Sequence, residues 1–241
     1  MKNPPLQQGH DGPRAPPLRP YQADTLQRMK SYEGNAALCV IATGLGKTRI
    51  FAEYIRCDVL ENDHHILILS HREELVIQPL EYLKGLPCGI EQGTTHAHGE
   101  PIISASVQSL VGRLDKYNPY SIDTIIIDEA HHAITDGYRR ILDYFSGAKV
   151  LGVTATPDRG DMRNLGEVFD SLAFEYKLTD AIKEGYLCKI MAQTIPLQLD
   201  ITSVTMSGGD YAVGDLGTAL DPYLEQIAAE MARRCKSRKT V

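Results

Sequence analysis

The sequence lacks any long apolar run. No stretch approaches the roughly 20 apolar residues that a membrane-spanning helix needs, although 43% of all residues are apolar. The first residues are rich in proline, glutamine and glycine and contain no apolar segment of the kind found in secretory signals. We therefore expect no membrane segment and a core sufficient for one domain, or for one domain and part of another.

The sequence also lacks paired cysteines. The five cysteines are scattered, and no C-x-x-C spacing occurs. This usage is typical of unpaired thiols in a reducing compartment, so we expect a cytoplasmic protein. Histidines cluster at His64-His65 and at His96 and His98, but no cysteine or carboxylate cluster has ligand spacing around them. This pattern favours loop histidines over a metal site.

An excess of positive charge is lacking as well. The chain has 25 lysines and arginines against 31 aspartates and glutamates, which gives a net charge of −6. A protein that holds phosphate backbones usually presents a basic face, so the balance argues against nucleic-acid binding. Net charge does not say where the charges lie, however, and the objection is weak for a cleft shared with a second domain.

Apolar strands and amphipathic helices alternate over most of the chain. Strands are predicted at 36–42, 65–69, 102–105, 124–127 and 149–153, and helices at 48–60, 73–83, from about 106, and at 138–145. Strands that are apolar on both faces predict an α/β fold, in which a parallel sheet is covered by helices on both faces. In such sheets ligands bind at the carboxyl ends of the strands.

The two ends of the chain differ from this alternating part. Residues 1–17 are rich in proline and are predicted to be a flexible tail, and one domain is predicted over 18–190. A strand at 173–178 and a short helix at 179–184 close that domain. Residues 191–241 are predicted to hold a linker, a helix at 221–236 and the start of a second domain.

A glycine-rich loop directly follows the first strand. It contains Thr43, Gly44, Leu45, Gly46, Lys47 and Thr48. Glycine lets the backbone amides turn inward and approach phosphate closely, and the next helix directs its N-terminal dipole at the same anion. In this pattern Lys47 reaches the β- and γ-phosphates and Thr48 places its hydroxyl on Mg²⁺. The common form of the loop has glycine where Ile41 stands, so a plain glycine turn remains the alternative.

Two adjacent acids, Asp128 and Glu129, follow the strand at 124–127. An aspartate at this place can hold magnesium, and the next carboxylate can orient or deprotonate the attacking water. The alternative is a pair of acids that only favours the dipole of a following helix. Together with the glycine loop, the pair indicates a nucleoside triphosphatase of the motor type.

Three segments resemble motifs I, II and III of superfamily 2 helicases. They are Gly44–Thr48, Asp128–His131 and Thr154–Thr156, and the most similar branch holds DEAH-type DNA repair helicases and restriction-enzyme motors. Three further segments match in the same order: Leu18–Gln22 ahead of motif I, Ser70–Leu75 with Gln78 as motif Ia, and Ser106–Leu110 as segment Ic. The resemblance covers about residues 18–190 and implies a RecA-like P-loop domain.

The resemblance also implies roles for single residues. Gln22 would select ATP by reading adenine, Asp128 would hold Mg²⁺ together with Thr48, and Glu129 would handle the water. His131 would link the nucleotide site to Thr154 and Thr156. The implied contacts to a nucleic-acid backbone, with DNA favoured over RNA, are Arg72, Ser106, Gln108 and Ser109. For these four, helix capping or an ordinary polar surface stays open as the alternative.

A second RecA-like lobe, with the arginines that stabilise the transferring phosphoryl group, is not evident in the sequence. We therefore expect a fragment or truncated product that alone binds ATP–Mg²⁺ weakly, hydrolyses it slowly and separates no strands. Two alternatives stay open: a translocase on duplex DNA that does not unwind it, and an ATP-gated binding module without enzymatic activity. A small-molecule kinase or a GTPase is disfavoured, because the helicase-type segments have no role in a kinase and no guanine signature occurs.

Overall fold

The computed structural model describes residues 16–155, 165–192, 206–207, 210–211 and 220–235. The chain divides into two compact units between Lys189 and Ile190. Most of the predicted tail over 1–17 and the predicted coupling residue Thr156 lie outside the described residues. Among the described residues, no helix is both long enough and apolar enough to cross a bilayer.

The first unit is built on a seven-stranded, fully parallel sheet with the strand order β3-β4-β2-β5-β6-β1-β7. Its strands are β1 (Ala36–Ile41), β2 (Ile66–Ser70), β3 (Cys88–Glu91), β4 (Ile102–Ser106), β5 (Thr124–Asp128), β6 (Lys149–Thr154) and β7 (Ser171–Tyr176). The central strands are buried along their whole length. This explains why they appear in the sequence as unbroken apolar runs.

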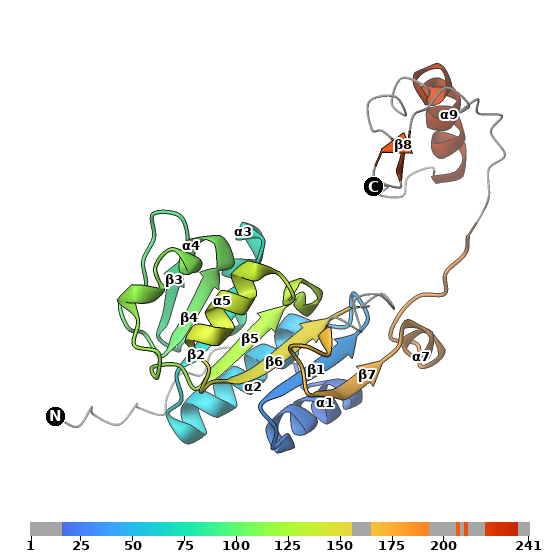
Figure 1. Cartoon of the computed structure of the whole chain (residues 1–241). Helices are drawn as coiled ribbons and strands as arrows, with labels where there is room; N and C mark the ends of the chain where they lie inside the picture. Colours follow the sequence, from blue (N-terminus) through green and yellow to red (C-terminus); the bar gives the residue numbers. More distant parts are fainter. Residues whose placement is uncertain (1–15, 156–164, 193–205, 208–209, 212–219, 236–241) are drawn as a thin grey trace. The chain divides into compact units, whose positions relative to one another are not determined.

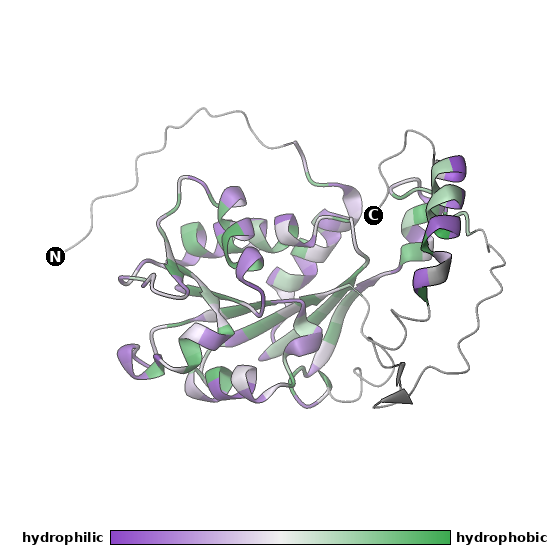
Figure 2. Cartoon of the chain, turned by 90° about the horizontal axis from the view of Figure 1, so that it is seen from above, coloured by the Kyte–Doolittle hydropathy of each residue, from purple (hydrophilic) through white to green (hydrophobic). Residues whose placement is uncertain are grey.

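Helices cover both faces of this sheet (Figures 1 and 2). They are α1 (Pro20–Ser31), α2 (Lys47–Asn62), α3 (Glu73–Tyr82), α4 (Val107–Val111), α5 (Asp136–Tyr144) and α7 (Leu178–Lys183), with short 3₁₀ turns η1 (Leu114–Lys116) and η2 (Ala130–His132). Figure 2 shows apolar strands between helices whose outer surfaces are polar.

Alternate residues of each strand enter two different cores. Cys39 and Ile41 of β1 pack with α1 and α2 on one face, whereas Leu38 and Val40 pack with α4 and α5 on the other. Burial of one large aliphatic side chain stabilises the fold by about 1.5–3 kcal/mol. Each face buries many such side chains, so the fold depends on the packing of helices on both faces. The predicted fold class, a RecA-like parallel sheet with helices on both faces, is confirmed.

Some elements were not anticipated from the sequence. Strand β3 is absent from the prediction, because Cys88–Glu91 is short and contains a glycine and a glutamate rather than an apolar run. It forms by pairing with β4, which is a tertiary effect. Helix α4 is only one turn long, and the predicted helix from 221 begins as a 3₁₀ turn, η3 (Asp221–Tyr223).

The second unit is described only in parts. Within 191–215, which was predicted to be a linker, the strands β8 (Met206–Ser207) and β9 (Asp210–Tyr211) pair antiparallel. Helix α9 (Leu224–Cys235) follows η3 and is amphipathic in sequence. Glu230 on this helix pairs with Arg233 and Arg234 one turn further along.

The strand register aligns the carboxyl ends of the central strands along one edge. Val40 of β1 is paired with Thr154 of β6, and the neighbouring Val153 is paired with Asp128 of β5. On the other side, Ser70 of β2 is paired with Ser106 of β4. The segments singled out after β1, β2, β4, β5 and β6 therefore begin at the same edge of the sheet.

Candidate nucleotide and nucleic-acid site

The glycine loop leaves the carboxyl end of β1 and leads directly into α2. Gly44 and Gly46 have φ angles of 83° and 78°, which lie in the left-handed region that favours glycine. Gly46 is the N-cap of α2, and Lys47 is its first residue. The free N–H groups of this sixteen-residue helix and its dipole therefore face the loop, which is the arrangement that binds phosphate at helix N-termini.

Residues at the start of α1 hold the loop in place. The Gln22 side chain is buried; its Nε2 donates to the carbonyl of Leu45 at 2.9 Å and its Oε1 accepts from the N–H of Arg19 at 2.9 Å. The hydroxyl of Tyr21 donates to the same Leu45 carbonyl at 2.9 Å. A side chain at Gly46 would meet the Gln22 amide at 2.8 Å, so the loop and the amide are closely fitted.

A cavity of about 250 Å³ opens beside Gln22 and the glycine loop. It is lined by Pro16, Pro17, Arg19, Gln22, Gly44, Leu45, Gly46 and Arg49. The sequence reasoning selected Gln22 but missed Tyr21, Arg19 and Arg49. Tyr21 could have been noticed as the neighbour of Gln22 in the matched segment, whereas Arg49 carries no signal in the sequence.

The glycine loop and the acidic pair meet at the carboxyl edge. Lys47 Nζ lies 3.6 Å from Glu129 Oε1, and the two side chains are 11% and 28% exposed. The ammonium group is thus aimed across the edge from α2 to the end of β5. Sequence positions more than eighty residues apart are brought to one point, as the matched patterns required.

Asp128 is buried at the end of β5, and its Oδ1 accepts one hydrogen bond, from the backbone N–H of Glu129 at 3.0 Å. Burial and, to a smaller extent, the negative charge of Glu129 raise the pKa of this carboxyl to about 6, although that hydrogen bond and the charge of Lys47 oppose the shift. A buried carboxylate with so little compensation is an energetically costly group, and a cation beside it would remove much of that cost.

Glu129 has a strained backbone and contacts both Lys47 and His131. Its φ angle is 52°, a conformation that costs a residue with a side chain about 1 kcal/mol or more. Its second carboxylate oxygen, Oε2, lies 3.4 Å from Nδ1 of His131. The same His131 nitrogen lies 3.1 Å from the hydroxyl of Thr154 on β6, which is fully buried. Strain of this kind is concentrated at functional sites.

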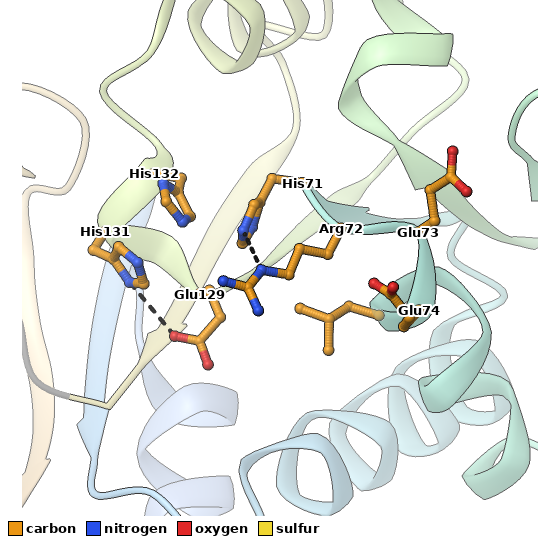
Figure 3. Close-up of a pocket in the computed structure, with 8 residues that line it drawn as sticks. His71, Arg72, Glu73, Glu74, Glu129, His131 and His132 are labelled. Atoms are coloured by element: carbon orange, nitrogen blue, oxygen red, sulfur yellow. Dashed lines mark hydrogen bonds and ion pairs between the residues drawn. The ribbon is translucent and has the colours of Figure 1, made fainter. Parts of the chain in front are cut away.

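A larger cleft of about 920 Å³ adjoins the acidic pair. It is lined by His71, Arg72, Glu73, Glu74, Leu75, Glu129, His131 and His132 (Figure 3). The Arg72 side chain extends from the start of α3 toward Glu129 in this view, and its Nε donates to Nε2 of His71 at 3.2 Å. Burial and the charge of Arg72 lower the pKa of His71, so this ring is neutral at pH 7.

The other predicted nucleic-acid residues lie next to Arg72 but differ in accessibility. Gln108 is exposed, and its Nε2 donates to the carbonyl of His71 at 3.0 Å, which ties the two matched segments together. Ser106 is buried and caps α4 by accepting from the N–H of Ser109 at 3.3 Å. The hydroxyl of Ser109 accepts from the N–H of Gly93 at 2.9 Å.

The clustered histidines outside the site have ordinary partners. His64 Nδ1 lies 3.1 Å from Asp58, and His96 Nδ1 lies 3.1 Å from the buried Glu91. Within the described ranges, no group of three or more histidines, cysteines or acids could hold a metal ion by protein ligands alone. The described cysteines whose side chains are placed are all free thiols.

Comparison with known proteins places this geometry in a family. Residues 15–159 match the family described as the type III restriction enzyme, res subunit. The chain is 33% identical over 228 residues to the putative ATP-dependent helicase IRC3 of Saccharomyces cerevisiae, with 86% of this chain and 33% of that protein covered. It is 29% identical over 184 residues to the type I restriction enzyme EcoAI endonuclease subunit of Escherichia coli, with 69% and 22% covered.

Solved structures share the fold. The helicase domain of Hef from Pyrococcus furiosus superposes with a TM-score of 0.56 at 24% identity, over 66% of this chain and 38% of that one. The chain spans about a third of the length of the yeast relative that it matches. Family match, sheet order and carboxyl-edge geometry agree: the chain belongs to the family of the type III restriction enzyme res subunit and carries the N-terminal RecA-like domain of a superfamily 2 helicase.

Proposed function

We propose that this chain is the ATP-binding half of a DNA motor that binds ATP with Mg²⁺ and hydrolyses it to drive movement along a strand. The observation that carries the proposal is the approach of Lys47 Nζ to Glu129 Oε1 at 3.6 Å. It joins the phosphate-binding loop to the acidic pair at one point of the sheet edge. A chain with only one of these features could bind a nucleotide but could not cleave it.

Lys47 and Glu129 divide the chemistry between them. With no phosphate nearby, the ammonium of Lys47 pairs with Glu129; when it binds β- and γ-phosphate oxygens instead, the carboxylate is released to orient the attacking water. Phosphoryl transfer depends on position and charge neutralisation, so these two side chains and the amides of Thr43, Gly44, Leu45 and Gly46 supply most of what one lobe can contribute.

The residues at the edge suit Mg²⁺. Asp128 is buried with a raised pKa and one backbone donor, so it gains from a divalent cation, and the Thr48 hydroxyl follows Lys47 on α2. Mg²⁺ takes one or two carboxylates and completes its shell with phosphate oxygens and water, so a cluster of protein ligands is not needed. When bound, the ion neutralises charge on the transferring phosphoryl group.

Gln22 suits adenine rather than guanine. After its bonds to Arg19 and Leu45, the amide retains one N–H and one lone pair on the oxygen. Adenine presents an acceptor at N7 and a donor at N6, which match this pair, whereas guanine presents two acceptors. The cavity of about 250 Å³ beside Gln22 is where the base would lie.

The second part of the proposal concerns coupling and nucleic acid. His131 bridges Glu129 and Thr154, so a change at the γ-phosphate can reach β6. A coupling role for Thr156, which lies outside the described residues, is proposed from the sequence alone. We infer that Arg72, Gln108 and Ser109 contact the nucleic-acid backbone. Ser106 would contribute through the cap that fixes Ser109, since its own hydroxyl is buried.

The test is a comparison of ATP turnover by the full-length protein with single-stranded DNA, duplex DNA, RNA and no nucleic acid. We expect turnover that requires Mg²⁺ and is stimulated most by DNA. ATP binding without turnover would indicate the ATP-gated module and refute the proposal. A labelled fork, beside a triplex-displacement substrate, then separates a helicase from a duplex translocase. This chain alone should turn over ATP slowly and separate no strands.

A further inference from the structure

A stack of imidazole rings connects Arg72 to the acidic loop. The ring centroids of His71 and His132 are 3.8 Å apart, and those of His132 and His131 are 4.1 Å apart. Figure 3 shows the three rings together at the top of the cleft, with Arg72 and Glu129 below them. The rings come from two segments about sixty residues apart, the end of β2 and the turn η2.

Each end of the stack is tied to a functional candidate. At one end, Nε2 of His71 accepts from Nε of Arg72 at 3.2 Å. At the other, Nδ1 of His131 lies 3.4 Å from Glu129 Oε2. His132 lies between them, and its ring contacts both neighbouring rings. The stack therefore runs without a break from a nucleic-acid candidate to the carboxylate that handles water.

We propose that His71 and His132 are positioning residues that transmit the engagement of a phosphodiester by Arg72 to the position of Glu129. The inference rests on the proposed function, because it assumes that Arg72 meets nucleic acid and that Glu129 acts in hydrolysis. It adds a second route to the one through Thr154: His131 faces β6, whereas His132 faces β2.

The geometry of Arg72 fits this role. The bond to His71 uses only the Nε–H of the guanidinium and fixes its plane. The four N–H groups on the two terminal nitrogens have no partner within the described part of the chain, and they form the fork that binds phosphate oxygens. A phosphodiester can therefore bind the fork while the same side chain still holds His71.

The stack also contains a feature that destabilises the fold, the buried Nδ1 of His71. Because Nε2 of His71 accepts from Arg72, its proton is assigned to Nδ1, and this N–H is buried without a hydrogen-bond partner among the described residues. A buried donor without a partner is costly, and such groups are rare in folded proteins. On the other side, η2 directly follows the strained Glu129, so a displacement of His132 moves the backbone that holds this carboxylate.

The test uses the full-length protein and three variants. The readouts are the ratio of turnover at saturating DNA to turnover without DNA, and the KM for ATP. His132→Ala removes the central ring, and we expect the ratio to fall at least about fivefold, the lower range of allosteric coupling, with a change in KM below twofold. His132→Phe keeps a flat ring and should restore the ratio to within twofold. His71→Phe keeps the stack but loses the acceptor for Arg72, so the ratio should fall again.

His98→Ala is the matched control, because His98 is an exposed loop histidine away from the stack. Its ratio should equal that of the wild type. An unchanged ratio in His132→Ala, or equal loss in the alanine and phenylalanine variants, would overturn the proposal. If His132→Ala does not fold, an unchanged ratio in His71→Phe has the same force. Absence of DNA-stimulated turnover in the wild type would refute the proposed function instead.

Discussion

Two buried aspartates at opposite edges of the sheet have very different surroundings. Asp58, on α2 beside the start of β5, has three side-chain partners: Asn62 at 2.8 Å, His64 at 3.1 Å and Thr124 at 3.3 Å. Asp128, at the end of β5, has one backbone donor and a pKa raised to about 6. Both residues are less than 10% exposed, so burial does not account for the contrast.

The contrast separates a structural edge from a functional one. At the amino edge the protein satisfies its own polar groups; the half-buried Lys149, for example, donates to the carbonyl of Tyr32 at 2.7 Å. At the carboxyl edge it leaves a carboxylate, an ammonium group and helix N–H groups poorly matched to one another. Charged and polar groups without full partners destabilise the fold, and they are retained at sites where a ligand supplies the missing partners.

The strongest test of the functional edge is Lys47→Ala. The variant removes the ammonium group that would meet the β- and γ-phosphates, so we expect ATP turnover by the full-length protein to fall at least about 10³-fold. The melting temperature should stay close to that of the wild type, because in the described residues the only ionic partner of Lys47 is Glu129. Turnover within tenfold of wild type would show that the loop does not hold phosphate.

Glu129→Gln separates binding from cleavage. The amide keeps the shape of the side chain but cannot take a proton, so turnover should fall about 10²-fold. Binding of ATP, measured with a fluorescent analogue, should persist or become tighter, since the negative charge beside Asp128 is removed. Wild-type turnover in this variant would mean that another group handles the water.

At the structural edge, Asp58→Ala should affect stability and not chemistry. It leaves the buried hydroxyl of Thr124 and the side chains of Asn62 and His64 without their acceptor, which should cost about 2 kcal/mol in the free energy of unfolding. Asp24→Ala, at an exposed pair with Arg28, is the matched control and should cost less than about 0.5 kcal/mol. Loss of turnover without loss of stability in Asp58→Ala would show that the amino edge is not purely structural.

The last test concerns pH. The pKa of Asp128 is about 6 in the folded chain against an ordinary value of 3.8, so the folded state binds the proton more tightly. The raised pKa therefore destabilises the fold increasingly as pH rises from about 4 to 6, and fully above that. Asp128→Asn removes this penalty and should stabilise the chain without nucleotide by up to about 3 kcal/mol at pH 7 and not at all below pH 4. Urea titrations of the wild type and the variant at pH 7 and below pH 4 measure this difference in the free energy of unfolding.

Much of this fold could be read from the sequence because its central strands are buried on both faces. Residues 36–41, 66–70 and 124–128 appear as apolar runs, and each run leads directly into one of the segments singled out in the sequence. Parallel pairing then brings those ends together without further information. The meeting of Lys47 and Glu129 follows from this logic.

What sequence reasoning missed depends on contacts between distant segments. Strand β3 forms only because β4 offers an edge, and the ring contact of His71 with His132 joins two segments with no shared pattern. The hydroxyl of Ser106 was interpreted as a phosphate contact, with capping as the alternative, and in the structure it caps α4. The roles assigned to the site residues stay predictions until the variants are measured.

The hydrogen bonds that orient Gln22 have a consequence for redesign of nucleotide selectivity. Its amide is oriented by the backbone of Arg19 and by the carbonyl of Leu45, so the protein itself holds in place the donor and acceptor that would read the base. A nucleotide that enters loses its own freedom but does not have to order this side chain. Conversion to guanine selectivity would therefore require rebuilding the whole support, because a new side chain at position 22 would inherit hydrogen-bond partners arranged for glutamine.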